Sequence, residues 1–141
     1  MNILISGGTS FLGRSLIPKL QKKNCKILLF TTNKGYFKAD KIFKKKNLKI
    51  ISNDQLNYIS KFKPDIFLNL QTMYNFNTEL KNISELIDAN IKTPLQLLFS
   101  SARTIQRLIS PSTYIIYDGT LKKVKPTNFF ASLKYAFSFI A

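Results

Sequence analysis

The sequence contains no histidine, no tryptophan, a single cysteine and only seven acidic residues among its 141. Without histidine, the usual general base and the commonest side-chain metal ligand are missing. Cys25 alone can form neither an internal disulfide nor a cysteine-rich zinc site. These absences exclude hydrolysis by a histidine-containing triad and zinc-dependent hydrolysis.

Long hydrophobic runs are lacking as well. No window approaches the ~18 uninterrupted apolar residues of a membrane-spanning helix. The opening "MNILIS" has no basic stretch before its apolar run, which argues against a signal peptide. We therefore expect a cytoplasmic protein with no membrane partner. The length suits one domain over 1–141, large enough to bury a core.

Positive charge is abundant, and the formal net charge is +15. A basic domain can gain affinity for nucleic acid by neutralising phosphates. Nucleic-acid surfaces favour arginine, however, and this chain has only Arg14, Arg103 and Arg107. The composition favours a solvated lysine surface. A basic nucleic-acid binder is kept as the weaker alternative, and it predicts salt-sensitive binding to polyanions.

Five short apolar runs alternate with longer amphipathic segments. Near-continuous apolar runs of this length are typical of parallel strands covered on both faces. The runs cover residues 2–6, 26–31, 48–51, 65–70 and 113–117. The alternation of strand and helix predicts an α/β fold, a Rossmann-type doubly wound parallel sheet of about five strands.

Two helices are expected from apolar residues at helical spacing. The first is marked by Leu12, Leu16, Ile17 and Leu20, and the second by Leu86, Ile87, Ile91, Leu95, Leu98 and Ala102. Pro18 predicts a kink in the first helix, because proline removes a backbone donor and clashes one turn back. The lysine-rich residues 33–47 are interpreted as a loose surface helix.

The segment "SGGTSFLG", residues 6–13, lies between the first strand and the first helix. In a strand–helix–strand unit, a phosphate binds at the free amides of the helix N-terminus. Gly7 would form the tight turn, and Gly13 would let the helix pack closely on the sheet. Ser10, at the position of closest approach, can cap the helix. An ordinary glycine-rich turn is the alternative.

The quoted turn and four later segments together resemble a known family. The segments are "ILISGGTSFLGRSLIPKL", "FKPDIFLNLQT", "IDANIKTPLQLLFSSAR", "STYIIYDGT" and "FFASLK". In this order they are similar to the extended short-chain dehydrogenase/reductases, or NAD-dependent epimerase/dehydratases, and especially to their nucleotide-sugar 4-ketoreductase branch. Such a resemblance covers nearly the whole chain and implies a dinucleotide cofactor, with a nucleotide sugar as a possible second ligand.

The resemblance also implies which residues hold NAD or NADP. They are Gly7, Thr9, Ser10, Phe11, Leu12, Gly13, Thr32, Asn33, Lys34, Asp54, Leu70, Gln71, Asn90 and Lys134. No acid follows the second strand, which mildly favours NADP, although Lys34 could equally be a solvated lysine. Asp54 either lies near the adenine or caps a helix over 54–62. Gln71, where a small residue is expected, narrows the pocket.

Catalysis is where the sequence departs from the family. The resemblance places the catalytic Ser/Thr at Thr120 and the lysine of the Y-x-x-x-K segment at Lys134, but Phe130 stands where the proton-transferring tyrosine belongs. None of the six tyrosines has a lysine four residues later. We therefore expect dinucleotide binding with impaired or absent turnover.

The family is usually longer, with a C-terminal substrate region that this chain lacks. The fold is therefore expected to be incomplete, and a truncated or regulatory subunit that pairs with a full-length paralogue is the alternative function. In the family, helices corresponding to 82–103 and 129–141 pair across a homodimer, so we expect a homodimer or a paralogue complex through these two helices.

Overall fold

The computed structural model of the chain describes residues 1–33, 35, 41–43, 46–74 and 80–141. Its centre is one sheet of five parallel strands in the order β3-β2-β1-β4-β5. The strands are β1 (Asn2–Ser6), β2 (Lys26–Phe30), β3 (Leu48–Ile51), β4 (Ile66–Asn69) and β5 (Arg107–Ile109). This confirms the predicted Rossmann-type fold.

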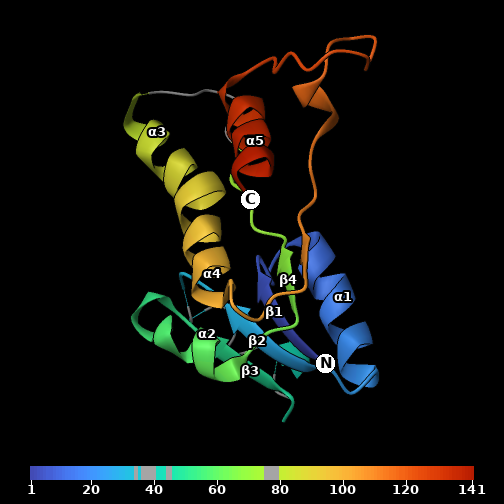
Figure 1. Cartoon of the computed structure of the whole chain (residues 1–141), viewed down its shortest axis with the longest axis vertical. Helices are drawn as coiled ribbons and strands as arrows, with labels where there is room; N and C mark the ends of the chain where they lie inside the picture. Colours follow the sequence, from blue (N-terminus) through green and yellow to red (C-terminus); the bar gives the residue numbers. More distant parts are fainter. Residues whose placement is uncertain (34, 36–40, 44–45, 75–79) are drawn as a thin grey trace.

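Helices cover both faces of the sheet (Figure 1). They are α1 (Phe11–Lys22), α2 (Asn57–Phe62), α3 (Leu80–Ile87), α4 (Thr93–Ser101) and α5 (Phe129–Ile140). A π-helical turn, Asp88–Lys92, joins α3 to α4. In the described part of the chain, no helix has both the length and the apolar character needed to cross a bilayer.

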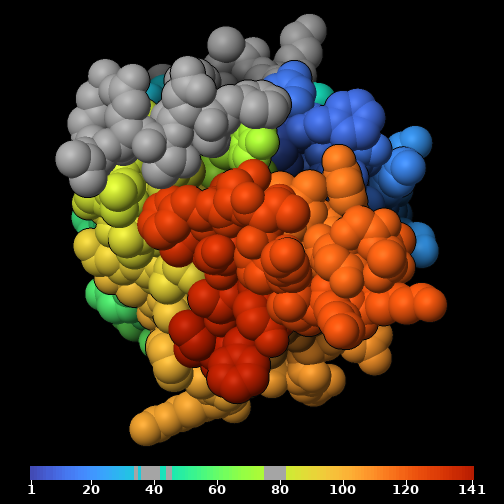
Figure 2. Space-filling model, turned by 90° about the horizontal axis from the view of Figure 1, so that it is seen from above, coloured from blue at the N-terminus to red at the C-terminus, as the bar shows by residue number. Residues whose placement is uncertain are grey.

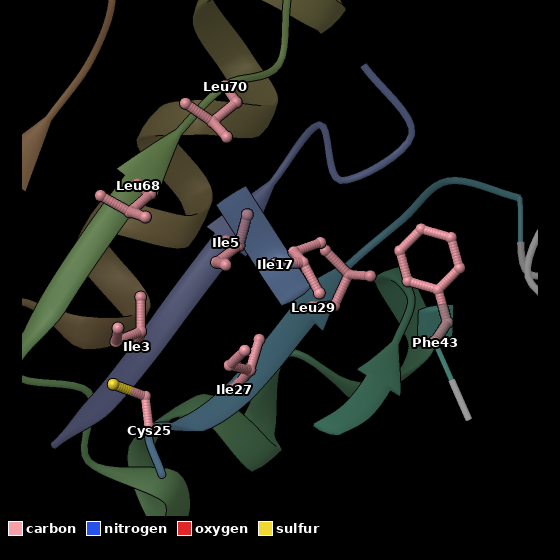
Figure 3. Packing of buried hydrophobic residues seen from close by; sticks show 9 residues of the cluster. All are labelled: Ile3, Ile5, Ile17, Cys25, Ile27, Leu29, Phe43, Leu68 and Leu70. Atoms are coloured by element: carbon pink, nitrogen blue, oxygen red, sulfur yellow. The ribbon is translucent and has the colours of Figure 1, made fainter. Parts of the chain in front are cut away.

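Alternate residues of each strand fill the two halves of the core, as the period of a strand requires. On one face, Ile5 of β1 and Leu29 of β2 pack against Ile17 of α1 (Figure 3). On the other face, Leu4 and Leu28 belong to a cluster with residues of α2 and α4. Both faces of the central strands are thus buried, which explains why their sequences are almost continuously apolar.

The fifth strand is not where the sequence analysis placed it. Residues 107–109 pair with β4, whereas Tyr114–Ile116 within the predicted run forms a short 3-10 helix. The prediction was wrong because β5 lies at the edge of the sheet. Its three residues are exposed, half-buried and exposed in turn, so they lack the apolar run typical of a central strand.

The second predicted helix is also interrupted. Pro94 has no N–H to donate to Asn90, and the Thr93 amide donates instead to the carbonyl of Asp88, five residues back. The wider turn shifts the buried face, which consists of Leu86, Asn90, Pro94, Leu97 and Ser101. Ile87 and Ala102, predicted on that face, are exposed.

Three smaller expectations also differ from the structure or lie partly outside it. Instead of one helix over 54–62, a 3-10 turn at Asn53–Gln55 precedes α2. Of residues 33–47, the 3-10 turn Lys41–Phe43 is described, and Phe43 is buried in the core instead of solvated. Pro18 lies within α1, which continues to Lys22, and the kink stays a prediction.

Candidate functional site

The turn after β1 can be built only with glycine at its first position. Gly7 has φ +72°, and a Cβ there would lie 2.5 Å from the backbone N of Gln71 and from the carbonyl oxygen of Leu70. Gly7 therefore lets the end of β1 lie directly against the chain leaving β4. The Ser10 amide closes the turn by donating to the Gly7 carbonyl at 3.0 Å.

Ser10 caps α1, as the sequence analysis expected. Its Oγ accepts a hydrogen bond from the Gly13 amide at 3.1 Å. A Cβ on Gly13 would lie 2.6 Å from the carbonyl oxygens of both Gly7 and Gly8, so the helix start is packed tightly on the turn. A side chain at Gly13 would collide with these two carbonyl groups and push the helix start away from the turn.

Two backbone amides at the start of α1 donate no hydrogen bond within the described residues. Gly13 is capped and Arg14 donates to the Ser10 carbonyl, whereas Phe11 and Leu12 have no acceptor within the described residues. Free amides at the positive end of a helix dipole bind anions such as phosphate. The local geometry therefore fits a phosphate-bearing ligand.

A cavity of about 340 Å³ opens beside this turn. It lies at the carboxyl ends of β1, β2 and β4, where the strand order changes direction and where open α/β sheets bind ligands. It is lined by Gly7, Gly8, Thr9, Ser10, Phe30, Thr31, Thr32, Leu70, Gln71, Thr72 and Ala89. Within the described part of the chain, no carboxylate lines it.

A second cavity of about 300 Å³ adjoins the first, since Ser10, Leu70, Gln71 and Thr72 line both. Its remaining walls come from α1, from the chain after β5 and from α5. They are formed by Phe11, Leu12, Asn69, Pro111, Ser112, Thr113, Phe130 and Lys134. We call the two cavities together the trough. Figure 2 shows α5 and the segment after β5 side by side over this end of the molecule.

Two hydrogen bonds, one buried and one partly buried, connect the ends of three neighbouring strands beneath the trough. Ser6 Oγ donates to Asn69 Oδ1 at 2.8 Å, and Asn69 Nδ2 donates to Ser110 Oγ at 3.2 Å. A buried polar group without a partner would destabilise the fold, so each of these side chains is held in place by its neighbour. This fixes the chain after β5 against β4.

Lys134 and Phe130 lie one helical turn apart on α5 and both line the second cavity. Burial lowers the pKa of Lys134, and no described carboxylate forms an ion pair with it. The Phe130 ring packs edge-on against the Tyr74 ring, with centroids 4.8 Å apart. Phe130 presents no ionisable group to the cavity, so the proton relay expected of a tyrosine is missing there.

Gln71 and Asn90 hold the wall of the trough. Gln71 lines the first cavity, and its Nε2 donates to the Ala89 carbonyl at 3.2 Å; that it narrows the pocket stays a prediction. Asn90 accepts from Thr72 and Met73 and donates to the carbonyls of Met73 and Leu86. These four bonds use its full capacity, so Asn90 supports the wall behind the trough and does not line it.

Two of the expected site residues, Thr120 and Asp54, lie away from the trough. Thr120 is exposed and donates to Asp118 at 2.6 Å, and it lines neither cavity. This hydrogen bond is the main cause that lowers the pKa of Asp118. Asp54 is exposed, accepts a bond from the Ser52 hydroxyl and lines neither cavity. Lys34 lies outside the described residues.

Of the cofactor residues expected after β2, one lines the trough and another faces away from it. Thr32 lines the first cavity. Asn33 turns toward the following chain, where its Oδ1 accepts from the Gly35 amide at 2.8 Å. The remaining cofactor residues inferred from the resemblance, from Gly7 to Gly13 together with Leu70, Gln71 and Lys134, lie in or around the trough.

Sequence reasoning missed several residues of the trough, among them Thr31, Thr72 and Ser112. Thr31 directly follows β2, and Ser112 comes three residues after β5. A correct prediction of where the strands end would have identified them, because the carboxyl ends of parallel strands meet at one edge of the sheet. Because the fifth strand was predicted at 113–117, Thr120 was placed at the site instead.

The sequence matches the model of the NAD dependent epimerase/dehydratase family over residues 3–138. The chain therefore belongs to this family. No curated protein is similar enough in sequence to count as a relative.

Solved structures of similar fold include MoeE5 in complex with UDP-glucose and NAD, at 14% identity and a TM-score of 0.78, covering 100% of this chain and 48% of that one. UDP-glucose 4-epimerase from Thermotoga maritima has 19% identity and a TM-score of 0.75, covering 99% and 50%. WbmG from Bordetella bronchiseptica, in complex with NAD and UDP, has 18% and 0.72, covering 99% and 49%. The chain spans about half the length of these structures.

The lowered pKa of Lys134 makes folding stability depend on pH. The unfolded chain keeps this proton up to about pH 10.4, whereas the folded chain loses it at lower pH, so stability rises with pH across that window. We expect Lys134→Met to be more stable than the wild type at pH 7. The gain should shrink as the pH approaches 10.4, as measured by urea denaturation.

Lys122→Met is the matched control for this experiment, because Lys122 is exposed. Subtracting wild-type stability at each pH removes the contribution of the other lysines. A gain for Lys134→Met that stays constant from neutral to alkaline pH would contradict the effect of burial on this group.

Proposed function

We propose that the chain is a single NAD(P)-binding domain whose trough holds the dinucleotide. The observation that carries this proposal is the start of α1, where the amides of Phe11 and Leu12 stand free beside Gly7 at the point where the strand order reverses. The pyrophosphate would accept from these amides. Membership of an NAD-dependent family supports the same ligand.

The adenosine would occupy the first cavity, with its ribose near Thr31 and Thr32. An acidic residue at the end of this strand normally binds the ribose diol of NAD. Hydroxyl groups stand there instead, and a phosphate on the ribose would meet no negative charge in the lining of this cavity. We therefore propose a mild preference for NADP over NAD.

The nicotinamide end would lie in the second cavity, whose exposed lining is largely apolar. When bound, the dinucleotide supplies hydride-transfer chemistry. Lys134 would donate a hydrogen bond to the nicotinamide ribose, and Phe130 would pack against the ligand without a proton to give or take. We propose that this chain binds the cofactor but does not turn over substrate.

A nucleotide sugar is the second ligand class that we propose. MoeE5 and the Thermotoga maritima epimerase were solved with UDP-glucose, and WbmG with UDP. Since this chain spans about half of those structures, the residues that would hold the sugar nucleotide are not all among the ones described. The sugar proposal therefore rests on family membership and on the second cavity, which Ser112 lines.

Replacing Gly13 tests the binding proposal. Gly13→Ala would place a methyl group 2.6 Å from two carbonyl oxygens and force the start of α1 away from the turn. We expect at least tenfold weaker binding of NADP and NAD in isothermal titration calorimetry. Gly119→Ala is the matched control, because a Cβ there meets nothing within 4 Å, and its affinity should equal the wild type.

The same titrations rank the two cofactors, and the wild type should bind NADP more tightly than NAD. Thermal denaturation of both variants separates loss of the site from loss of the fold. If the folded wild type shows no heat of binding at millimolar NAD or NADP, the proposed function is refuted.

Restoring the missing phenol should not restore turnover. Phe130→Tyr would place a hydroxyl one helical turn before Lys134, but with UDP-glucose as substrate we expect neither a change in the absorbance of the nicotinamide nor a new nucleotide sugar by chromatography. The reason is that the chain corresponds to about half of the matched structures. Phe130→Leu serves as the control without a phenol. Turnover above that control would contradict the proposed loss of catalysis.

As a second candidate, we propose a regulatory subunit that associates through α3, α4 and α5. The supporting observation is the exposure of the neighbouring residues Phe139 and Ile140 at the end of α5, at 83% and 55%. Large exposed apolar side chains that lie together mark interaction surfaces. The partner would be a second copy of the chain or a longer paralogue.

Light scattering tests this association. We expect a dimer mass for the wild type, and a monomer mass for Phe139→Glu because a charge would be buried at the interface. Ser132→Glu, an exposed position on the same helix, is the control. A monomeric wild type at high concentration would contradict the homodimer. A complex formed only with a longer homologue would favour a regulatory subunit.

A further inference from the structure

Lysines gather at the end of the sheet opposite to the trough. A recess of about 700 Å³ opens at the amino ends of β1, β2 and β3, beside the C-terminal end of α2. Five of its ten lining residues are lysines, namely Lys26, Lys46, Lys49, Lys61 and Lys63, and each is exposed. Among the residues that the structure describes, no acidic one lines it. We call this recess the lysine groove.

The floor of the lysine groove is held by internal hydrogen bonds. Asn2 Nδ2 donates to the carbonyls of Phe62 and Lys63 at 2.8 and 3.2 Å, and Asn47 Nδ2 donates to the Cys25 carbonyl at 2.8 Å. The nearby Asp65 accepts from the Asn2 amide at 2.7 Å. The lysines are thus held close together on a fixed surface, where their mutual repulsion favours an anionic partner.

A second recess of about 390 Å³ continues from the lysine groove, since Lys63 lines both. It carries Arg103 and the ring of Phe99, which is 70% exposed, whereas the hydroxyls of Ser60, Ser100 and Thr104 donate to backbone carbonyls. An exposed aromatic ring beside an arginine is a stacking platform for bases, and a guanidinium group can donate to phosphate oxygens. This platform favours a nucleic acid over an acidic protein surface, because a protein carries no bases to stack on the ring.

We propose that the lysine groove and the Phe99 recess together bind the phosphate backbone and bases of a single-stranded nucleic acid. The exposed Phe99 ring favours a single strand, because unpaired bases can stack on it whereas the bases inside a duplex are already stacked on each other. This proposal does not rest on dinucleotide binding, since neither recess shares a residue with the trough.

Charge reversal at three groove positions tests the proposal. Lys26, Lys46 and Lys61 would be changed to glutamate together, which leaves Lys49 on the Tyr58 ring and Lys63 at the end of α2 in place. Fluorescence anisotropy with a labelled oligothymidylate at low salt should show at least tenfold weaker binding. Because each phosphate contact contributes a slope of about −0.7 in log affinity against log salt, the slope should fall by about 2.

The control reverses the same number of charges elsewhere. Lys122, Lys123 and Lys125 are exposed and line neither recess, so their joint change to glutamate should leave the affinity within about twofold and the salt slope unchanged. Circular dichroism melting verifies that both triple variants are folded. Equal losses in the two variants would show a general field effect and overturn the groove.

Stacking is tested separately at Phe99. Phe99→Ala should weaken binding severalfold without changing the salt slope, since stacking involves no counterion release. Tyr114→Ala, at a ring that is 77% exposed in the 3-10 turn Tyr114–Ile116, should have no effect. Absence of oligothymidylate binding by the wild type, equal affinity for a duplex of the same length, or equal competition by polyglutamate would each overturn the proposal. Loss of dinucleotide binding would leave it standing.

Discussion

The contact between Gly7 and the backbone of Leu70 and Gln71 is the constraint on which the site depends. It exists because Gly7 has a positive φ and no side chain, so β1 and β4 can end against each other. The turn that follows starts α1 with two free amides, and the chain leaving β4 becomes the shared wall of both cavities. A bulkier residue at this junction would separate the parts of the trough.

The two ends of the sheet have different electrostatics, although both lie in a strongly basic chain. At the carboxyl end, fixed backbone amides offer a small directed site for one phosphate-bearing ligand. At the amino end, five lysines offer a diffuse field suited to a chain of phosphates. The net charge of +15 could not distinguish a directed phosphate site from a diffuse lysine field, because it does not depend on where the lysines lie in the structure.

Much of the fold could be read from the sequence. The central strands are buried on both faces and therefore appear as apolar runs, and the glycine turn identifies where β1 ends. β5 could not be found this way, since an edge strand of three residues needs no apolar run, and Thr120 was consequently placed at the site in place of Ser112. The π-helical turn was equally hidden, although Pro94 removes the donor that a regular helix would require.

The sequence alone determined the chemistry that is present or missing: a glycine turn with a capping serine, Lys134, and Phe130 in place of a tyrosine. Side-chain identity is a local property, so it needs no coordinates. Only the tertiary structure decided which residues meet, because burial and cross-strand contacts join segments far apart in the chain. That is why Asn90 proved to support the wall, Ser110 to continue the hydrogen bonds from Ser6, and the lysines to gather at one end of the sheet.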